Sequence, residues 1–169
     1  MSRYRPPRPR SSPYITPAGF ARLNDELKHL WKEKRPEVTR KVSEAAAMGD
    51  RSENAEYIYG KKQLREIDAR VRFLSKRLDE LKVVDRPPRE TDRIYFGAWV
   101  TLQDESGATF RYRLVGPDEF DAEPGYISID SPMARALLGK RVDDEIELTR
   151  DGVSQAYCVN EITYQQATG

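Results

Sequence analysis

The 169-residue chain contains only one cysteine, Cys158, and only one histidine, His29. A single cysteine cannot form a disulfide within the chain, and a zinc site of the Cys/His kind lacks ligands. A Ser–His or Cys–His catalytic unit would need one of these two residues, and neither has triad partners near it in the sequence. We therefore interpret His29 as a surface residue on a helix and Cys158 as a half-buried residue on a strand.

Long apolar runs are also absent. No segment approaches the roughly 20 apolar residues that cross a bilayer, and the N-terminal arginines are not followed by the apolar stretch of a secretory signal. Hydrophobic residues make up 38% of the chain, charged residues make up 34%, and the mean hydropathy is −0.78. This balance is typical of a protein with much surface, such as an elongated helical element, and we expect it to be cytoplasmic with no membrane contact.

The formal net charge of +1 hides an asymmetry along the chain. Residues 1–17 carry four arginines and no acid, residues 18–84 carry a net +4, and residues 85–169 carry a net −7. A basic first half suggests a part that faces polyanions, although neutral drift explains a split of this size equally well. Residues 1–14 mix Arg, Pro and Ser with almost no apolar residues, which predicts a disordered basic tail with at most a weak nucleic-acid contact.

Two long helices are predicted over residues 15–85. The first begins at Thr16-Pro17, an N-cap followed by a first-turn proline, and Pro36 should interrupt it with a kink. The second should begin near Ser52. Apolar residues recur every three or four positions along both helices: Phe20, Leu23, Leu27 and Leu30, then Leu64, Ile67, Val71, Leu74, Leu78 and Leu81. The short break between them predicts an antiparallel coiled-coil hairpin, roughly 45 Å long, with its tip at residues 48–54.

The period of apolar residues changes from 3.5 to 2 after a linker over residues 86–91. Residues 92–169 should form a small domain with one antiparallel sheet and one short helix that begins at Ser131-Pro132. The expected strands are centred on Ala98–Leu102, Phe110–Leu114, Tyr126–Ile129, Val142–Leu148 and Ala156–Tyr164. The sequence as a whole therefore predicts an α+β protein.

The predicted tip carries two acidic residues, Asp50 and Glu53, three positions apart. Carboxylates in this arrangement suit a hard divalent cation, although two of them are too few for a tight site without ligands from a partner. Helix capping explains them too, with Asp50 as N-cap and Glu53 at the third helical position. Basic residues flank the tip at Arg51, Lys61, Lys62 and Arg65, where they could face a nucleic-acid backbone or form a solvated helix flank.

Two segments make a family recognisable. Residues 49–57 (GDRSENAEY) resemble the tip signature of the GreA/GreB transcription elongation factors, and residues 127–140 (ISIDSPMARALLGK) resemble their second signature. The resemblance covers about residues 14–165, and Leu30-Trp31, Arg51 and Lys61-Lys62 are more similar to GreB than to GreA. The Arg/Pro tail and the residues after Lys140 depart from the family pattern.

The resemblance implies a function. The hairpin would enter the secondary channel of a backtracked bacterial RNA polymerase, where Asp50 and Glu53 help to hold the second Mg²⁺ for cleavage of the nascent RNA 3′ end. The factor would then have no cofactor of its own and would not be an enzyme by itself. Residues 92–169 would adopt an FKBP-like fold that docks on the polymerase through Asp130, Ser131 and Pro132.

Several alternatives stay open from the sequence. Ordinary capping and a first-turn proline also explain Asp130, Ser131 and Pro132. An inhibitor of the same fold or a coiled-coil adaptor would bind without cleavage, and a prolyl isomerase is suggested by fold analogy alone. The resemblance implies a monomer, whereas heptads on long helices leave a dimer open.

Overall fold

The computed structural model describes residues 10–49 and 53–164. The chain forms two compact units. Residues up to Gly19 and residues from Lys82 onward make up the first unit, and Phe20–Leu81 make up the second. In the described residues, no helix is long and apolar enough to cross a membrane.

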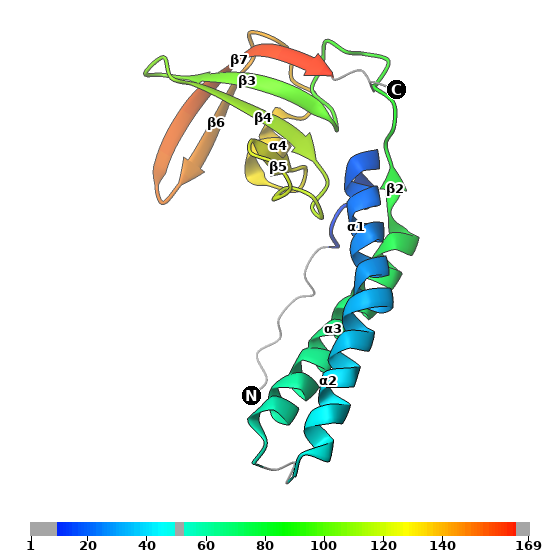
Figure 1. The fold of residues 1–169 in the computed structure, drawn as a ribbon. Coiled ribbons are helices and arrows are strands. Elements are labelled where there is room, and N and C mark those ends of the chain that lie inside the picture. The colour runs from blue at the N-terminus through cyan, green and yellow to red at the C-terminus, as the bar shows by residue number, and fades with distance from the viewer. Residues whose placement is uncertain (1–9, 50–52, 165–169) are drawn as a thin grey trace, which may run out of the picture. The chain divides into compact units, whose positions relative to one another are not determined.

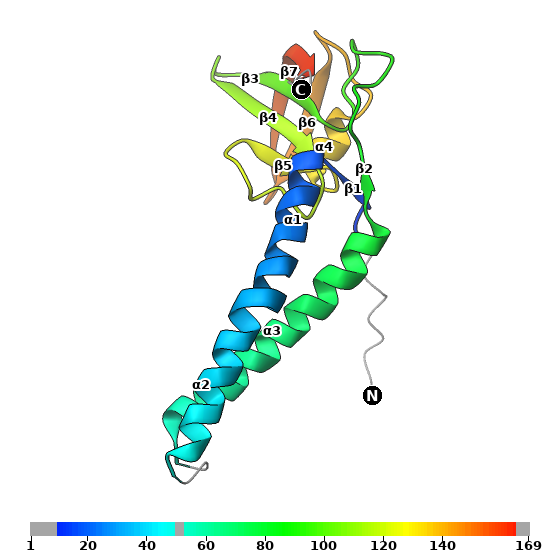
Figure 2. The same ribbon diagram turned by 45° about the vertical axis from the view of Figure 1, so that its right-hand side comes forward.

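The second unit is an antiparallel helical hairpin, as predicted. Its first arm consists of α1 (Pro17–His29), a π-helical turn (Leu30–Lys34) and α2 (Arg35–Ala47), and its second arm is α3 (Ala55–Glu80). Figures 1 and 2 show α2 and α3 side by side along their length. Two ion pairs join the arms, Arg35 to Asp68 and Arg70 to Glu26, each with a closest distance of 2.7 Å. The hydrogen bond with Arg70 lowers the pKa of Glu26.

The buried seam of the hairpin shows how the first arm tolerates Pro36. The buried apolar residues are Leu23, Leu30, Val38 and Ala45, so their spacing is seven, eight and seven. The step of eight spans the π-helical turn, in which the Arg35 amide donates to the Leu30 carbonyl five residues earlier. Because such a turn holds an extra residue, it keeps the apolar residues on one side although proline cannot donate a hydrogen bond. The interruption expected at Pro36 is therefore a π-helical turn.

Close contact between the arms near the tip depends on a glycine. Gly60 is buried on α3, and a Cβ atom at this position would lie 2.6 Å from Cγ2 of Val42 on α2. Glycine in a helix interior costs about 1 kcal/mol relative to alanine, so its presence here is explained by the close approach.

The first unit contains a five-stranded sheet in the order β5-β4-β3-β7-β6. Its strands are β3 (Ala98–Asp104), β4 (Thr109–Val115), β5 (Tyr126–Ser128), β6 (Glu145–Arg150) and β7 (Val153–Tyr164). Neighbouring strands are antiparallel except β4 and β5, so the sheet is mixed. One face of the sheet is covered by the short helix α4 (Pro132–Leu137), and both contribute to an apolar core (Figure 1). The predicted α+β class is confirmed. The prediction of a purely antiparallel sheet is wrong, because β4 and β5 run parallel.

The segment before β6 differs from the prediction. A strand was expected from Val142, but β6 begins at Glu145. Asp143 has a φ of 73°, and the Arg141 amide donates to the Asp144 carboxylate at 2.8 Å. A residue with positive φ cannot continue a strand, so residues 141–144 form a turn.

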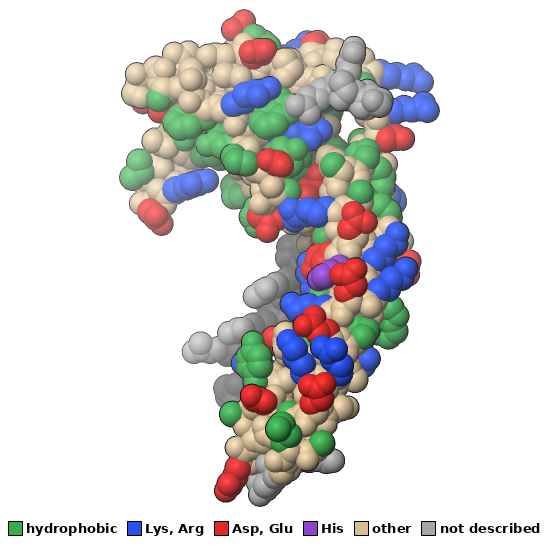
Figure 3. Space-filling model, in the orientation of Figure 1, with side chains coloured by type: hydrophobic (Ala, Val, Ile, Leu, Met, Phe, Trp, Pro, Cys, Tyr) green, Lys and Arg blue, Asp and Glu red, His purple; other side chains and the backbone are tan. Residues whose placement is uncertain are grey.

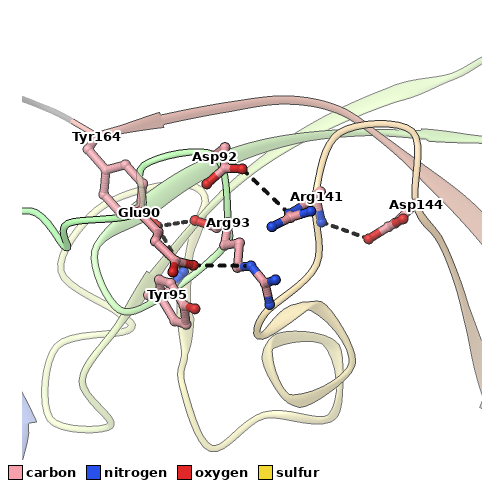
Figure 4. A network of polar contacts seen from close by, with 7 residues as sticks. All are labelled: Glu90, Asp92, Arg93, Tyr95, Arg141, Asp144 and Tyr164. Atoms are coloured by element: carbon pink, nitrogen blue, oxygen red, sulfur yellow. Dashed lines mark hydrogen bonds and ion pairs between the residues drawn. The ribbon is translucent and has the colours of Figure 1, made fainter.

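Polar contacts join this turn to the segment before β3 (Figure 4). Arg141 lies 3.5 Å from Asp92, and Arg93 lies 3.2 Å from Glu90. At the end of β7, the Tyr164 hydroxyl donates to the Arg93 carbonyl at 2.5 Å and accepts from the Tyr95 amide at 2.9 Å. Burial raises the pKa of Tyr164.

The N-terminal residues of the described chain take part in this unit. A short strand, β1 (Tyr14–Ile15), pairs in parallel with β2 (Lys82–Val83). Ser12 donates to both carboxylate oxygens of Asp130, from its amide at 2.9 Å and from its hydroxyl at 2.5 Å. The predicted disordered tail of residues 1–14 is therefore wrong for Ser12–Tyr14, and residues 1–9 lie outside the described residues.

A buried carboxylate holds the first turn of α1. Glu119 is 1% exposed, and its two oxygens accept from the Thr16 amide at 2.8 Å and the Thr16 hydroxyl at 2.6 Å. The Thr16 hydroxyl oxygen in turn accepts from the Gly19 amide at 3.1 Å, which makes Thr16 the expected cap. A Cβ atom at Gly19 would lie 2.5 Å from the Glu119 carboxylate, so only glycine fits there without a shift.

Candidate functional site

The end of the hairpin joins α2 to α3. The first arm ends at Ala47, and the Met48 amide donates to the Ala45 carbonyl at 3.2 Å. The second arm begins at Ala55, and Asn54 is its N-cap. Of the predicted site residues on this loop, Glu53 is described, whereas Asp50 and Arg51 lie outside the described residues.

The position of Glu53 overturns one of the two interpretations of the acidic pair. A capping box would place Glu53 in the third helical position. In the structure Glu53 is exposed and precedes the N-cap. The helix begins later than Ser52 because Asn54, a strong N-cap residue, accepts from the Tyr57 amide at 3.1 Å. Glu53 therefore does not complete a capping box.

Asn54 is a residue that the sequence analysis missed. Its side-chain amide also donates to the Ala45 carbonyl in the last turn of α2, at 2.7 Å. The side chain thus binds the end of one helix and the start of the next. Its signal was present in the sequence, because asparagine ranks with aspartate and serine among the preferred N-caps.

The acidic residues of the tip suit a metal ion that is also held by a partner better than a metal ion held by this chain alone. No group of three or more His, Cys, Asp or Glu side chains that could hold a metal occurs in residues 10–49 and 53–164. The exposed carboxylate of Glu53 has oxygen donors of the kind that Mg²⁺ prefers, but one or two carboxylates leave most of an octahedral shell to other ligands. The donor set therefore fits a metal whose remaining ligands come from elsewhere.

Three of the basic residues predicted to flank the tip lie in the first half of α3. Lys61, Lys62 and Arg65 are exposed, and none of them forms an ion pair with another described residue. Lys41, on α2, lies 3.2 Å from Glu37. Figure 3 shows acidic and basic side chains interleaved along the hairpin. The exposure and positive charge of Lys61, Lys62 and Arg65 suit an anionic ligand.

The three residues expected to dock lie at the start of α4. Ser131 is the N-cap and accepts from the Ala134 amide at 3.2 Å, and Pro132 is the exposed first residue of the helix. Asp130 does not cap the helix, because both of its carboxylate oxygens accept from Ser12. The capping interpretation thus describes Ser131 and Pro132 correctly and is wrong for Asp130.

Comparison with known proteins agrees with the two signature segments. Residues 13–83 match the family described as transcription elongation factor, N-terminal, and residues 89–164 match the GreA/GreB C-terminal family. Transcription elongation factor GreB of Pseudomonas aeruginosa is 61% identical over 167 residues, which cover 99% of each chain. GreB of Haemophilus ducreyi is 58% identical over 153 residues, which cover 90% of this chain and 94% of the relative.

A solved structure, the GreA factor homolog Gfh1 of Thermus thermophilus, is 28% identical with a TM-score of 0.39, covering 89% of this chain and 97% of that one. The two family matches together span nearly all of the described residues, and the GreB relatives match over most of their own length. The chain therefore belongs to the GreA/GreB family of transcription elongation factors.

Proposed function

We propose that this chain binds a bacterial RNA polymerase, inserts the end of its hairpin into the secondary channel and stimulates cleavage of the nascent RNA 3′ end in backtracked complexes. The observation that carries the proposal is the exposed carboxylate of Glu53, which lies outside the α3 cap at the end of a helical hairpin. Membership in an elongation-factor family supports polymerase as the partner.

Asp50 and Glu53 would hold a second Mg²⁺ together with ligands from the polymerase, since the chain brings too few donors to bind one alone. When bound, this ion would supply charge stabilisation and an activated water for phosphodiester hydrolysis. The water oxygen bonds to phosphorus, the bond to the leaving 3′ oxygen breaks, and that oxygen takes up the proton that the water loses. The chain contributes positioned carboxylates to this reaction and is an accessory factor rather than the enzyme.

The other predicted residues have separate tasks in this proposal. Asp130, Ser131 and Pro132 contact the polymerase and set affinity. Lys61, Lys62 and Arg65, with Arg51, face the extruded RNA, because basic side chains attract the phosphates of a nucleic-acid backbone.

The test uses purified protein and a stalled, backtracked elongation complex, with RNA length as the readout. Wild-type protein should shorten the RNA, and Asp50→Asn with Glu53→Gln should abolish the shortening while polymerase binding stays nearly unchanged. Normal cleavage by the double variant would show that the carboxylates are not needed. Binding without any cleavage by the wild type would favour an inhibitor or a coiled-coil adaptor.

A further inference from the structure

The Asn54 side chain makes two hydrogen bonds of opposite kind. Its Oδ1 accepts from the Tyr57 amide at 3.1 Å, and its Nδ2 donates to the Ala45 carbonyl at 2.7 Å. An N–H can only donate and a carbonyl can only accept, so the two partners fix the orientation of the amide. One side chain thereby satisfies a backbone group at the start of α3 and another at the end of α2.

Capping alone does not account for this residue. Aspartate and serine cap a helix about as well as asparagine, but neither offers an N–H from its side chain to the Ala45 carbonyl. Ala45 is a buried residue of the seam, and Gly60 approaches Val42 closely within the same hairpin. The bridge therefore connects the loop to a tightly packed part of the two helices.

Glu53 directly precedes Asn54, so the bridge fixes the backbone from which the Glu53 carboxylate extends. We infer that Asn54 is a positioning residue, which holds Glu53 in place across the end of the hairpin so that its carboxylate meets the reacting centre of the polymerase. This inference rests on the proposed function and adds to it a residue with no reacting group of its own. Small displacements of catalytic groups are costly, because rate depends steeply on geometry.

Two substitutions separate the bridge from the cap. Both substitutions retain an oxygen for the Tyr57 amide. Asn54→Asp loses the donor to the Ala45 carbonyl and adds a charge, whereas Asn54→Ser stays neutral and replaces the amide N–H by the O–H of a shorter side chain. Asn160→Asp is the matched control, since Asn160 is exposed, donates to Gln103 at 3.1 Å and lies in the other unit. Slow hydrogen exchange at the Tyr57 amide would show that the cap survives in each Asn54 variant.

We expect both Asn54 variants to bind polymerase normally and to cleave roughly ten- to a hundredfold more slowly at saturating factor. Raised Mg²⁺ should restore part of this rate, because a misplaced carboxylate weakens metal retention and not the fold. Asn160→Asp should cleave at the wild-type rate. The double variant Asn54→Ser with Glu53→Gln should cleave no more than about twofold more slowly than Glu53→Gln alone. The effects of substituting two residues that act as a unit are not additive.

The outcomes distinguish this inference from the proposed function. If the Asn54 variants cleave at the wild-type rate while Glu53→Gln does not, the inference is overturned and the proposed function stands. Losses that multiply in the double variant would show that Asn54 acts independently of Glu53, which also overturns it. Wild-type protein that leaves the RNA intact would overturn the proposed function, and the inference with it.

Discussion

Removal of the Glu119 side chain should destabilise the first unit of the protein. In Glu119→Ala, the amide and the hydroxyl of Thr16 both lose their acceptor, and Thr16 is 4% exposed. Each buried donor left without a partner costs about 1–3 kcal/mol, and a water in the vacated space would offset part of this. We therefore expect the free energy of unfolding to fall by roughly 2–4 kcal/mol.

Urea unfolding followed by circular dichroism measures this change, with Glu123→Ala as a control from the same loop, because the Glu123 residue is exposed. The control should stay within about 0.5 kcal/mol of wild type. If the free energy of unfolding falls by less than about 0.5 kcal/mol in Glu119→Ala, Glu119 does not anchor the start of α1.

The same carboxylate should leave a signature in the pH dependence of stability. Burial raises the pKa of Glu119, against the opposing effect of the hydrogen bonds from Thr16. A raised pKa in the folded state means that stability is fully present below the unfolded pKa of about 4.3 and is lost as pH rises through the folded value. Wild-type stability relative to Glu119→Gln should therefore decrease as pH rises from about 4.3 through that value. A difference that is flat or increases with pH would contradict a burial-dominated carboxylate.

Three further predictions concern the hairpin and the docking residues. Gly60→Ala should lower the unfolding midpoint despite alanine's higher helix propensity, because its Cβ would lie 2.6 Å from Val42; a raised midpoint would show that α2 yields easily. Charge reversal at Lys61, Lys62 and Arg65 should slow cleavage of deeply backtracked complexes more than of shallow ones, and added salt should give the same ranking; equal slowing would favour a solvated flank. Pro132→Ala should weaken polymerase binding without lowering the cleavage rate at saturating factor, and the reverse pattern would exclude a docking role.

The hairpin and the main strands could be predicted because their signals are periodic and local. On α3, Gly60, Ile67 and Leu74 are buried at seven-residue spacing. On β3, Ala98, Val100 and Leu102 are buried in alternation. The pairing of β1 with β2 could not be predicted, because two-residue strands carry no period. The contacts of Ser12 with Asp130 and of Thr16 with Glu119 were also missed, since each joins residues more than 100 positions apart.

The candidate site shows the same division between local and distant information. The acidic residues of the tip could be named from the sequence, but the predicted start of the second helix near Ser52 was too early, because its N-cap is Asn54. The true start of the helix decides the role of Glu53. A glutamate at the third helical position completes a capping box, whereas a residue before the N-cap does not. The bond from Asn54 to the Ala45 carbonyl makes the later start the stable one, since it satisfies both helix ends with one side chain. A single asparagine thus takes the cap position, and the neighbouring Glu53 lies outside the cap.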